Sequence, residues 1–249
     1  MFESLGVRMG FVHLHCRSAF SLKDGAFLPE ALAAAAAELG MPAVALTDRD
    51  ALYGAARFVD ACERVGVRPI LGSLLTLDEG EVLLLARTDA GYANLCRLIT
   101  HAHMSGERGE PSVTAGEVLR RADGLVALLG PGSPPGRLAL RGRLGAAREL
   151  LRPWREAFGG WCFVEVRNLL EPMSAAEVRT LLRLADEAGV PAAATNAVRH
   201  LVPEDAFVAD ALECMRELVP VAEHHLTRWN NEGFLKPAAA MRGLFAGRP

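Results

Sequence analysis

Short apolar runs that alternate with longer helical segments shape this chain up to about residue 200. Seven such runs, each rich in Leu or β-branched residues, cover residues 11–15, 42–47, 68–72, 82–86, 124–129, 161–166 and 190–195. Helical segments separate most of these runs, and the clearest two, 29–39 and 174–188, are each followed directly by a glycine, the residue that commonly ends a helix. Such alternation is typical of βαβ units built around a parallel sheet. The sequence therefore predicts an α/β fold.

Two features bear on how the seven expected strands are arranged. The turn sequence Asp78-Glu79-Gly80 leaves no room for a helix between the third and fourth runs, so we expect these two to form a hairpin. The chain has no G-x-G-x-x-G motif after its first run and no G-x-x-x-x-G-K-[ST] motif anywhere, which removes the usual nucleotide-binding reasons for an open sheet. We therefore expect a barrel whose functional side chains lie at the C-terminal ends of its strands.

Charge and composition exclude several classes of protein. The chain has 249 residues and a net charge of only −3, so no strong overall basic field would attract nucleic acid, and a DNA contact would need a local patch or a partner. The five cysteines are scattered and form no C-x-x-C pair, which favours reduced thiols. No apolar run is long enough to span a bilayer, and residues 1–8 lack the layout of a signal peptide. We expect a cytoplasmic protein with no membrane partner.

The segment richest in side chains suited to chemistry, residues 13–25, begins within the first apolar run. Side chains two apart on a strand share a face, so His13 and His15 could enter one cavity near Asp24. Two imidazoles and a carboxylate are suitable ligands for zinc, manganese or iron. A single H-x-H pair on a strand is, however, about as often structural as it is metal-binding. A metal-dependent hydrolase also needs further ligands from other strand ends.

The later strand ends offer more arginines than ligands. Asp48 lies next to Arg49, which suits a salt bridge better than a metal, and Glu81 is one possible oxygen donor. Together the expected strand ends present Arg17, Arg49, Arg167 and Arg199. Such a concentration of positive charge repels divalent cations. The residues alone therefore argue against a site with several metal ions.

Several segments resemble a known family in the same order along the chain. Residues 13–25 resemble the first motif of the PHP (polymerase and histidinol phosphatase) superfamily, in the form found on bacterial DNA polymerase III alpha subunits. Residues 47–54, 69–72 and 195–200 resemble its later motifs, and residues 91–98 resemble a helix typical of the polymerase branch. Residues 234–245 resemble the polymerase segment that joins this module to the palm.

This resemblance implies a fold, a context and a set of partners. The fold would be a distorted seven-stranded (β/α) barrel over residues 1–218, followed by a connector over 219–249 that leads into a polymerase palm. The chain would be the N-terminal PHP module of the alpha subunit. Its partners would be the remaining polymerase domains of the same polypeptide, with a proofreading exonuclease subunit as a further candidate. DNA would be contacted only through the full polymerase.

The resemblance also implies where a cluster of metal ions would bind. His15 and Asp24 remain at ligand positions, and Glu81 is a possible substitute ligand. The other positions of the expected cleft hold Arg17, Asp48, Arg49, Leu74, Pro131, Ala197 and Arg199. We therefore expect a degenerate site with no metal cofactor and no catalytic residue, and hence a scaffold. The alternative is a metal-dependent phosphoesterase or 3′–5′ exonuclease that holds Zn or Mn in a reduced site at His15, Asp24 and Glu81.

Overall fold

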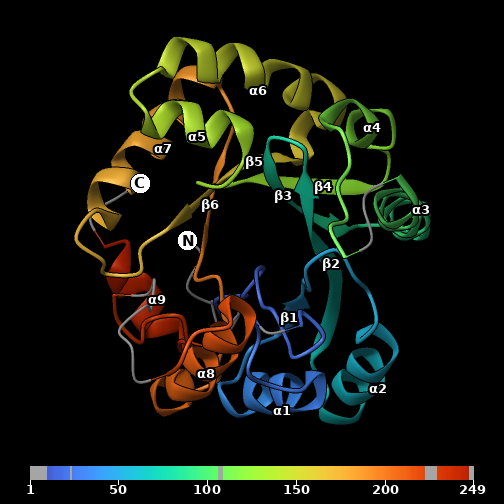
Figure 1. The fold of residues 1–249 in the computed structure, drawn as a ribbon, viewed down its shortest axis with the longest axis vertical. Coiled ribbons are helices and arrows are strands. Elements are labelled where there is room, and N and C mark those ends of the chain that lie inside the picture. Colours follow the sequence, from blue (N-terminus) through green and yellow to red (C-terminus); the bar gives the residue numbers. More distant parts are fainter. Residues whose placement is uncertain (1–9, 23, 106–108, 222–228, 247–249) are drawn as a thin grey trace, which may run out of the picture.

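A curled, mixed sheet with helices packed around it forms the body of the molecule in the computed structural model (Figure 1). The structure describes residues 10–22, 24–105, 109–221 and 229–246. The helices are α1 (Pro29–Glu38), α2 (Ala55–Val65), α3 (Asp89–Ser105), α4 (Ala115–Arg120), α5 (Pro134–Leu140), α6 (Leu144–Phe158), α7 (Ser174–Ala188), α8 (Ala206–Glu217) and α9 (Ala238–Leu244). Short 3-10 turns occupy Gly159–Trp161 and Pro203–Asp205. No helix in the described ranges is long and apolar enough to cross a membrane.

The sheet has six strands that follow one another in sequence order. They are β1 (Ala43–Leu46), β2 (Arg68–Leu77), β3 (Gly80–Ala86), β4 (Leu125–Leu129), β5 (Cys162–Arg167) and β6 (Ala192–Thr195). β3 runs antiparallel to both of its neighbours, and the other pairs are parallel. The predicted hairpin is therefore confirmed, as β2 and β3 joined through Asp78 and Glu79.

The expected first strand, residues 11–15, does not form, so the prediction of a complete seven-stranded barrel is not met. The segment lies between two neighbours: Ala45 donates its backbone N–H to the His13 carbonyl at 2.9 Å, and Val198 donates to the His15 carbonyl at 2.8 Å. Thr47, two residues after Ala45, donates to Cys16, three residues after His13. The first segment thus advances by three residues where β1 advances by two, and this one extra residue breaks the regular ladder. The sheet is a curled half-barrel of six strands.

Apolar packing is divided between the two ends of the sheet. The larger cluster joins β3, β4 and β5 to α3, α6 and α7, with Leu84, Leu95 and Trp154 fully buried. A second cluster joins β1 to α1 and α2 around Leu32 and Phe58. A third, smaller cluster lies on the sheet itself and joins Ala45 of β1 and Leu74 of β2 to residues of β3 and β4.

The C-terminal segment folds back onto this body. Phe234 forms a bridge with His200, and Leu235 donates its N–H to the His200 carbonyl at 3.2 Å. Leu235 is buried in the cluster around β1, and Met241 of α9 is buried as well. The C-terminal segment is therefore part of the hydrophobic core of the module.

Candidate functional site

Four arginines from distant segments converge where the carboxyl ends of the strands meet. Arg17 follows the irregular first segment, Arg49 follows β1, Arg167 ends β5, and Arg199 follows β6. Burial lowers the pKa of Arg17, Asp24 opposes that shift, and the positive charges of Arg199, Arg49 and Arg167 lower the pKa further, so each of these three arginines lies within electrostatic reach of Arg17. The side chains that the sequence placed at the expected strand ends are thus brought together.

Asp24 lies between two of these arginines. Its Oδ2 atom lies 2.5 Å from Nη1 of Arg17, and its Oδ1 atom lies 2.9 Å from Nε of Arg199. Arg199 also reaches Oε2 of Glu213 on α8, at 3.7 Å. Burial raises the pKa of Asp24, but the charges of Arg17 and Arg199 outweigh that effect and the net shift is downward. Asp24 is therefore an ionised carboxylate whose two oxygens both face guanidinium groups.

Glu81 is held in the same way at the other side of the cleft. Nη2 of Arg49 lies 3.0 Å from its Oε2 atom, and Nη1 of Arg49 donates to the Thr76 hydroxyl at 3.5 Å. Burial raises the pKa of Glu81, while Arg49 and Arg167 lower it by more. Glu81, which the sequence suggested as a substitute metal ligand, is therefore already paired with Arg49.

Asp48 contacts serines and not the neighbouring arginine. Its Oδ1 atom accepts a hydrogen bond from the Ser18 backbone N–H at 2.7 Å and one from the Ser21 hydroxyl at 2.8 Å. Burial raises its pKa, and the hydrogen bonds from Ser21 and Ser18 oppose that rise. Among the described residues it forms no ion pair with Arg49, so the expected salt bridge is absent because the serine loop saturates the carboxylate first.

His15 belongs to a buried polar group that the sequence did not reveal. Its Nδ1 atom lies 2.7 Å from Oε1 of Glu165 in β5, and the Thr195 hydroxyl donates to the same oxygen at 2.6 Å. Burial lowers the pKa of His15, whereas Glu165, whose burial alone would raise its pKa, is brought to about 2 by His15 and Arg167. A neutral imidazole therefore donates to an ionised carboxylate. Within the described part of the chain Nε2 of His15 has no hydrogen-bond partner.

His13 does not share this cavity with His15. It donates from Nε2 to the Lys236 carbonyl at 2.9 Å, and its ring packs edge-on against Phe11. Burial lowers the pKa of His13 to about 4, although the hydrogen bond to Lys236 opposes the shift. The two histidines point to different parts of the molecule because the first segment is not a regular strand.

The remaining expected ligand positions carry no suitable donors. Leu74 is buried in β2, Pro131 lies in the turn after β4, and Ala197 follows β6 with a positive φ of 46°. Across the described ranges no group of three or more His, Cys, Asp and Glu side chains is arranged to hold a metal ion. The side chains present do not fit the metal cluster that the family resemblance implies.

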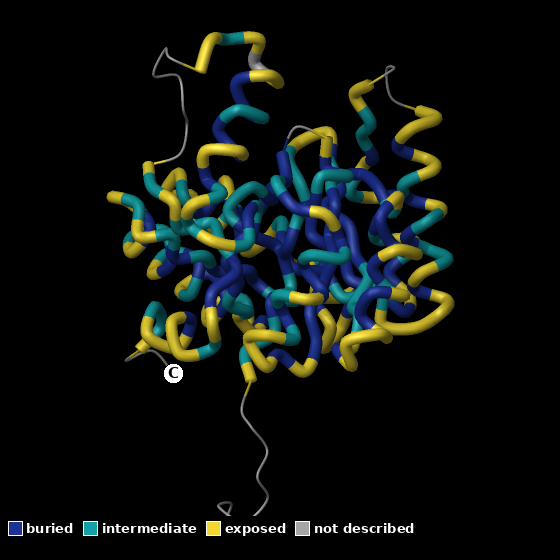
Figure 2. Tube along the Cα trace, turned by 90° about the horizontal axis from the view of Figure 1, so that it is seen from below, coloured by how far each residue is buried: buried dark blue, intermediate teal, exposed yellow. Residues whose placement is uncertain are grey.

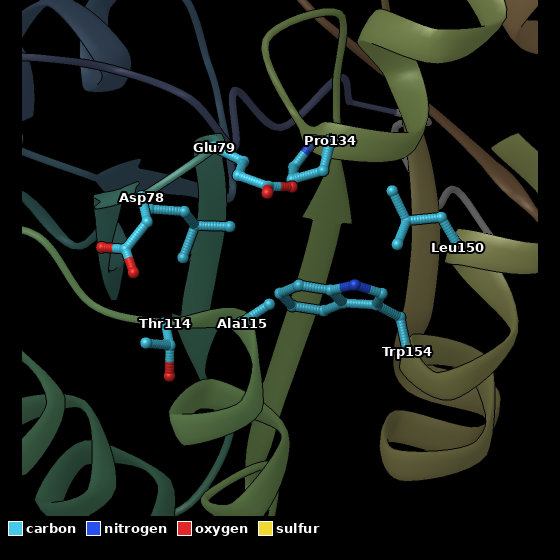
Figure 3. A pocket seen from close by; sticks show the side chains of 8 residues that line it. Asp78, Glu79, Thr114, Ala115, Pro134, Leu150 and Trp154 are labelled. Atoms are coloured by element: carbon cyan, nitrogen blue, oxygen red, sulfur yellow. The ribbon is translucent and has the colours of Figure 1, made fainter.

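Three cavities can be compared with this cleft. One of about 120 Å³ is lined by Arg17, Arg167 and Arg199, and a neighbouring one of about 300 Å³ is lined by Asp24, Arg49 and residues of α3 and α8. A third, of about 210 Å³, lies at the β2–β3 turn above the Trp154 indole (Figure 3). It contains none of the expected site residues. Of these three, the first two therefore belong to the candidate site and the third does not.

Comparison with families and curated proteins gives a consistent result. The family model described as PHP domain matches residues 13–168. An error-prone DNA polymerase of Symbiobacterium thermophilum is 38% identical over 97% of this chain, and the DNA polymerase III subunit alpha of Caulobacter vibrioides is 34% identical over 96%. The chain spans only 24% and 22% of the lengths of these two relatives.

Solved structures share the fold at low identity. A Bifidobacterium adolescentis protein described as a metal-dependent phosphoesterase superposes with a TM-score of 0.52 and 18% identity, covering 75% of this chain and 86% of its own. An amidohydrolase from Chromobacterium violaceum, solved with bound sulfate and no metal, gives a TM-score of 0.50 and 18% identity, covering 74% of this chain and 86% of its own. Both support the architecture and nothing finer.

Proposed function

The chain belongs to the PHP domain family, and on this basis we propose that it is the N-terminal PHP module of a bacterial DNA polymerase III alpha subunit, acting as a scaffold with a degenerate metal site. Support comes from relatives that carry polymerase names and match 96–97% of this chain. The parent polypeptide would serve DNA replication or repair synthesis in the cytoplasm. Residues 219–249 would lead into the palm, whose carboxylates hold the ions for nucleotidyl transfer.

One observation carries the degenerate site: guanidinium groups take the place of metal ions around Asp24. A carboxylate that would bind a metal is instead bound by Arg17 and Arg199, and both arginines stand where the family resemblance places ligands. Charge-assisted hydrogen bonds of this kind satisfy the oxygens and neutralise the buried charge. These two contacts support a cleft in which arginines neutralise Asp24 in place of a metal ion.

These ion pairs also explain how the module could act as a scaffold. Asp24 and Arg199 lie far apart in sequence, and Glu213 extends the same group of charges to α8. Arg49 and Glu81 connect the loop after β1 to β3. The pairs of Arg199 therefore connect segments that no ladder joins, whereas the Arg49–Glu81 pair reinforces strands that are already paired through β2.

A reduced metal site is the second candidate, and one observation favours it. Nε2 of His15 has no hydrogen-bond partner among the described residues, while Glu165 binds its Nδ1–H, the arrangement by which carboxylates commonly orient metal-binding histidines. A phosphoesterase or 3′–5′ exonuclease of this kind would need Asp24 and Glu81 as further ligands. Both carboxylates would first have to leave their arginines.

Metal content separates the two candidates. We expect plasma mass spectrometry of protein purified without a histidine tag, and dialysed against manganese or zinc, to give a stoichiometry near zero. Nuclease assays with either metal should show no activity. One tightly held ion per chain, lost in a His15→Ala variant, would establish the reduced site instead.

The polymerase assignment has its own test. The polypeptide encoded by the complete reading frame should extend a primed template, whereas the 249-residue chain should not. A longer polypeptide without polymerase activity would refute the assignment, whatever its metal content.

A further inference from the structure

The cavity at the β2–β3 turn lies outside the cleft and has walls of its own. Its volume is about 210 Å³, and its lining joins the turn to the starts of α4 and α5 and to α6. Buried residues form the interior of the molecule and exposed residues its outside (Figure 2). Leu77 and Trp154 at the base of the cavity are buried, whereas Asp78, Glu79 and Thr114 at its rim are exposed. The cavity therefore leads from the surface to an apolar base.

The indole of Trp154 turns a hydrogen-bond donor toward this cavity. The side chain is 1% exposed, and its Nε1–H has no acceptor among the residues that the structure describes. Figure 3 shows the nitrogen-bearing edge of the ring on the side that faces Glu79 and Pro134. A buried indole N–H usually has a hydrogen-bond partner. The missing acceptor is one that an occupant of the cavity would supply.

The two carboxylates at the rim differ in what they contact. Asp78 accepts a hydrogen bond from the Ser112 hydroxyl at 2.9 Å, and its carboxylate points away from the Trp154 ring (Figure 3). The Glu79 carboxylate points across the cavity toward Pro134, and within the described ranges it forms no hydrogen bond or ion pair. Glu79 is therefore an acceptor on the opposite side of the cavity from the Trp154 donor.

The charges and the size of the cavity restrict what it can hold. Asp78 and Glu79 repel an anion. Nη1 of Arg137 lies 3.4 Å from the Glu79 carbonyl oxygen, so a cation placed beside Glu79 would meet that guanidinium. The volume of about 210 Å³ is below the roughly 300 Å³ at which pockets for drug-sized ligands begin. A neutral molecule with a single ring fits these limits.

We propose that this cavity binds a small neutral ring whose edge carries an amide-like pair of groups, an acceptor for Trp154 and an N–H donor for Glu79. A ring with a carboxamide and a nucleobase both have such an edge. Leu77, Leu150 and Trp154 would surround the apolar part of the ring. The site shares no residue with the arginine cleft, and the inference does not depend on the proposed function.

Nuclear magnetic resonance tests the proposal, because the indole N–H groups of Trp154, Trp161 and Trp229 are three separate probes. We expect nicotinamide and cytosine, titrated in parallel into the 249-residue chain, to shift the Trp154 signal and leave the other two unchanged. The signal is assigned with a Trp154→Phe variant. The dissociation constant should be on the order of 1 mM, since so small a ligand makes few contacts. Tighter binding of one compound identifies the source of the amide-like edge, a carboxamide or a nucleobase.

Two matched controls make the result specific. Nicotinate has the same ring with a carboxylate in place of the carboxamide, so it lacks the N–H donor and should not shift the Trp154 signal. A Glu79→Ala variant should bind nicotinamide about tenfold more weakly, because it loses a charged hydrogen-bond acceptor. Its melting temperature should stay that of the wild type, since the side chain is exposed. Glu63→Ala, which removes an exposed carboxylate on α2, should leave the affinity unchanged.

Three outcomes would overturn the inference. An unchanged Trp154 signal with both nicotinamide and cytosine would show that the cavity takes no such ring. A shift of equal size with nicotinate would show that the amide-like edge is not recognised. Wild-type affinity in the Glu79→Ala variant would place the ligand elsewhere.

Discussion

At the scale of single residues, the carboxylates of the cleft differ in the partners that they contact. Asp24 has two arginines, Glu81 has Arg49, and Glu165 has a neutral histidine and a threonine hydroxyl. The pairs differ in exposure: the side chains of Arg199 and Asp24 are 21% and 8% exposed, against 36% and 23% for Arg49 and Glu81. Buried pairs are costly to break, and exposed pairs contribute little. Mutations that break these two pairs should therefore lower the free energy of unfolding by different amounts.

We expect Arg199→Ala to lower the free energy of unfolding by about 2 kcal/mol, because it leaves buried Asp24 and Glu213 each with one arginine fewer. Arg49→Ala should cost only about 0.5 kcal/mol, since its ion pair is more exposed than that of Arg199. Thermal unfolding followed by circular dichroism measures both. Arg152→Ala, on the exposed face of α6, is the control and should change nothing. Unaltered melting of the Arg199 variant would remove the argument that arginines stabilise the cleft.

The buried histidine at position 13 predicts a pH dependence. Its pKa is about 4 in the folded protein, against an ordinary value of 6.5, so the unfolded chain binds a proton more readily between these values. Stability should fall as pH drops from 6.5 to 4, by about 3 kcal/mol for this residue. Buried His15 adds to the slope in the same direction.

A His13→Gln variant keeps a donor for the Lys236 carbonyl but cannot take up the proton. Urea unfolding at pH 7 and at pH 4.5 should therefore show a smaller difference in the variant than in the wild type. The exposed His101 supplies the control, because His101→Gln should leave the difference unchanged. An identical pH dependence in all three proteins would contradict the prediction that protonation of His13 lowers stability at acid pH.

At the scale of elements, close backbone contacts decide how helices meet the sheet. The first turn of α3 lies against the turn before β4, where Arg87 donates its N–H to the Gly124 carbonyl at 2.9 Å. Gly91 permits this approach, because a Cβ atom there would overlap the Gly124 carbonyl. Asn94 adds a hydrogen bond to the Asp123 carbonyl at 3.0 Å.

Gly91→Ala should therefore destabilise the protein by about 2–3 kcal/mol, since neither backbone can move away freely. The matched control is Gly116→Ala in α4, where the added Cβ would meet its nearest neighbour at 3.7 Å. That substitution should raise stability by about 0.5–1 kcal/mol through helix propensity. Chemical denaturation of the two variants provides the comparison. Equal effects would mean that α3 does not require the close contact.

At the scale of the whole molecule, the C-terminal segment joins the two ends of the incomplete barrel. Asn196 donates to the carbonyls of Glu232 and Phe234 at 2.8 Å each, and Leu235 enters the cluster around β1. Lys236 is buried at 3% exposure, where Glu232 and the Phe234 ring contact its ammonium group. The connector is thus packed onto the module that precedes it.

Removal of this segment should therefore destabilise the module. A fragment ending at residue 218 loses the buried side chains of Leu235 and Met241, and we expect it to be at least about 3 kcal/mol less stable than the 249-residue chain. A fragment ending at residue 246 keeps both side chains and is the control. Thermal unfolding of the three proteins measures the difference. Equal melting temperatures would show that the barrel is self-sufficient without its connector.

Much of the fold could be predicted from the sequence because local patterns specify it. Each of the last six predicted apolar runs overlaps a strand, and the hairpin at Asp78 and Glu79 forms as expected. The first run failed because the sequence pattern cannot show the extra residue between His13 and Cys16, which appears only when the neighbouring strands are in place. Strand formation there depends on register with distant partners.

The sequence by itself determined most of the elements and the gathering of Arg17, Arg49, Arg167 and Arg199 at the strand ends, since these follow from periodicity and residue order. The family followed from the resemblance of its motifs. Tertiary structure alone decided which charges pair. Glu165 was a lone charge inside the apolar run of β5, a signal that something would meet it, but its partner His15 is 150 positions away. Contacts between distant segments depend on how elements pack, and no local pattern encodes that packing.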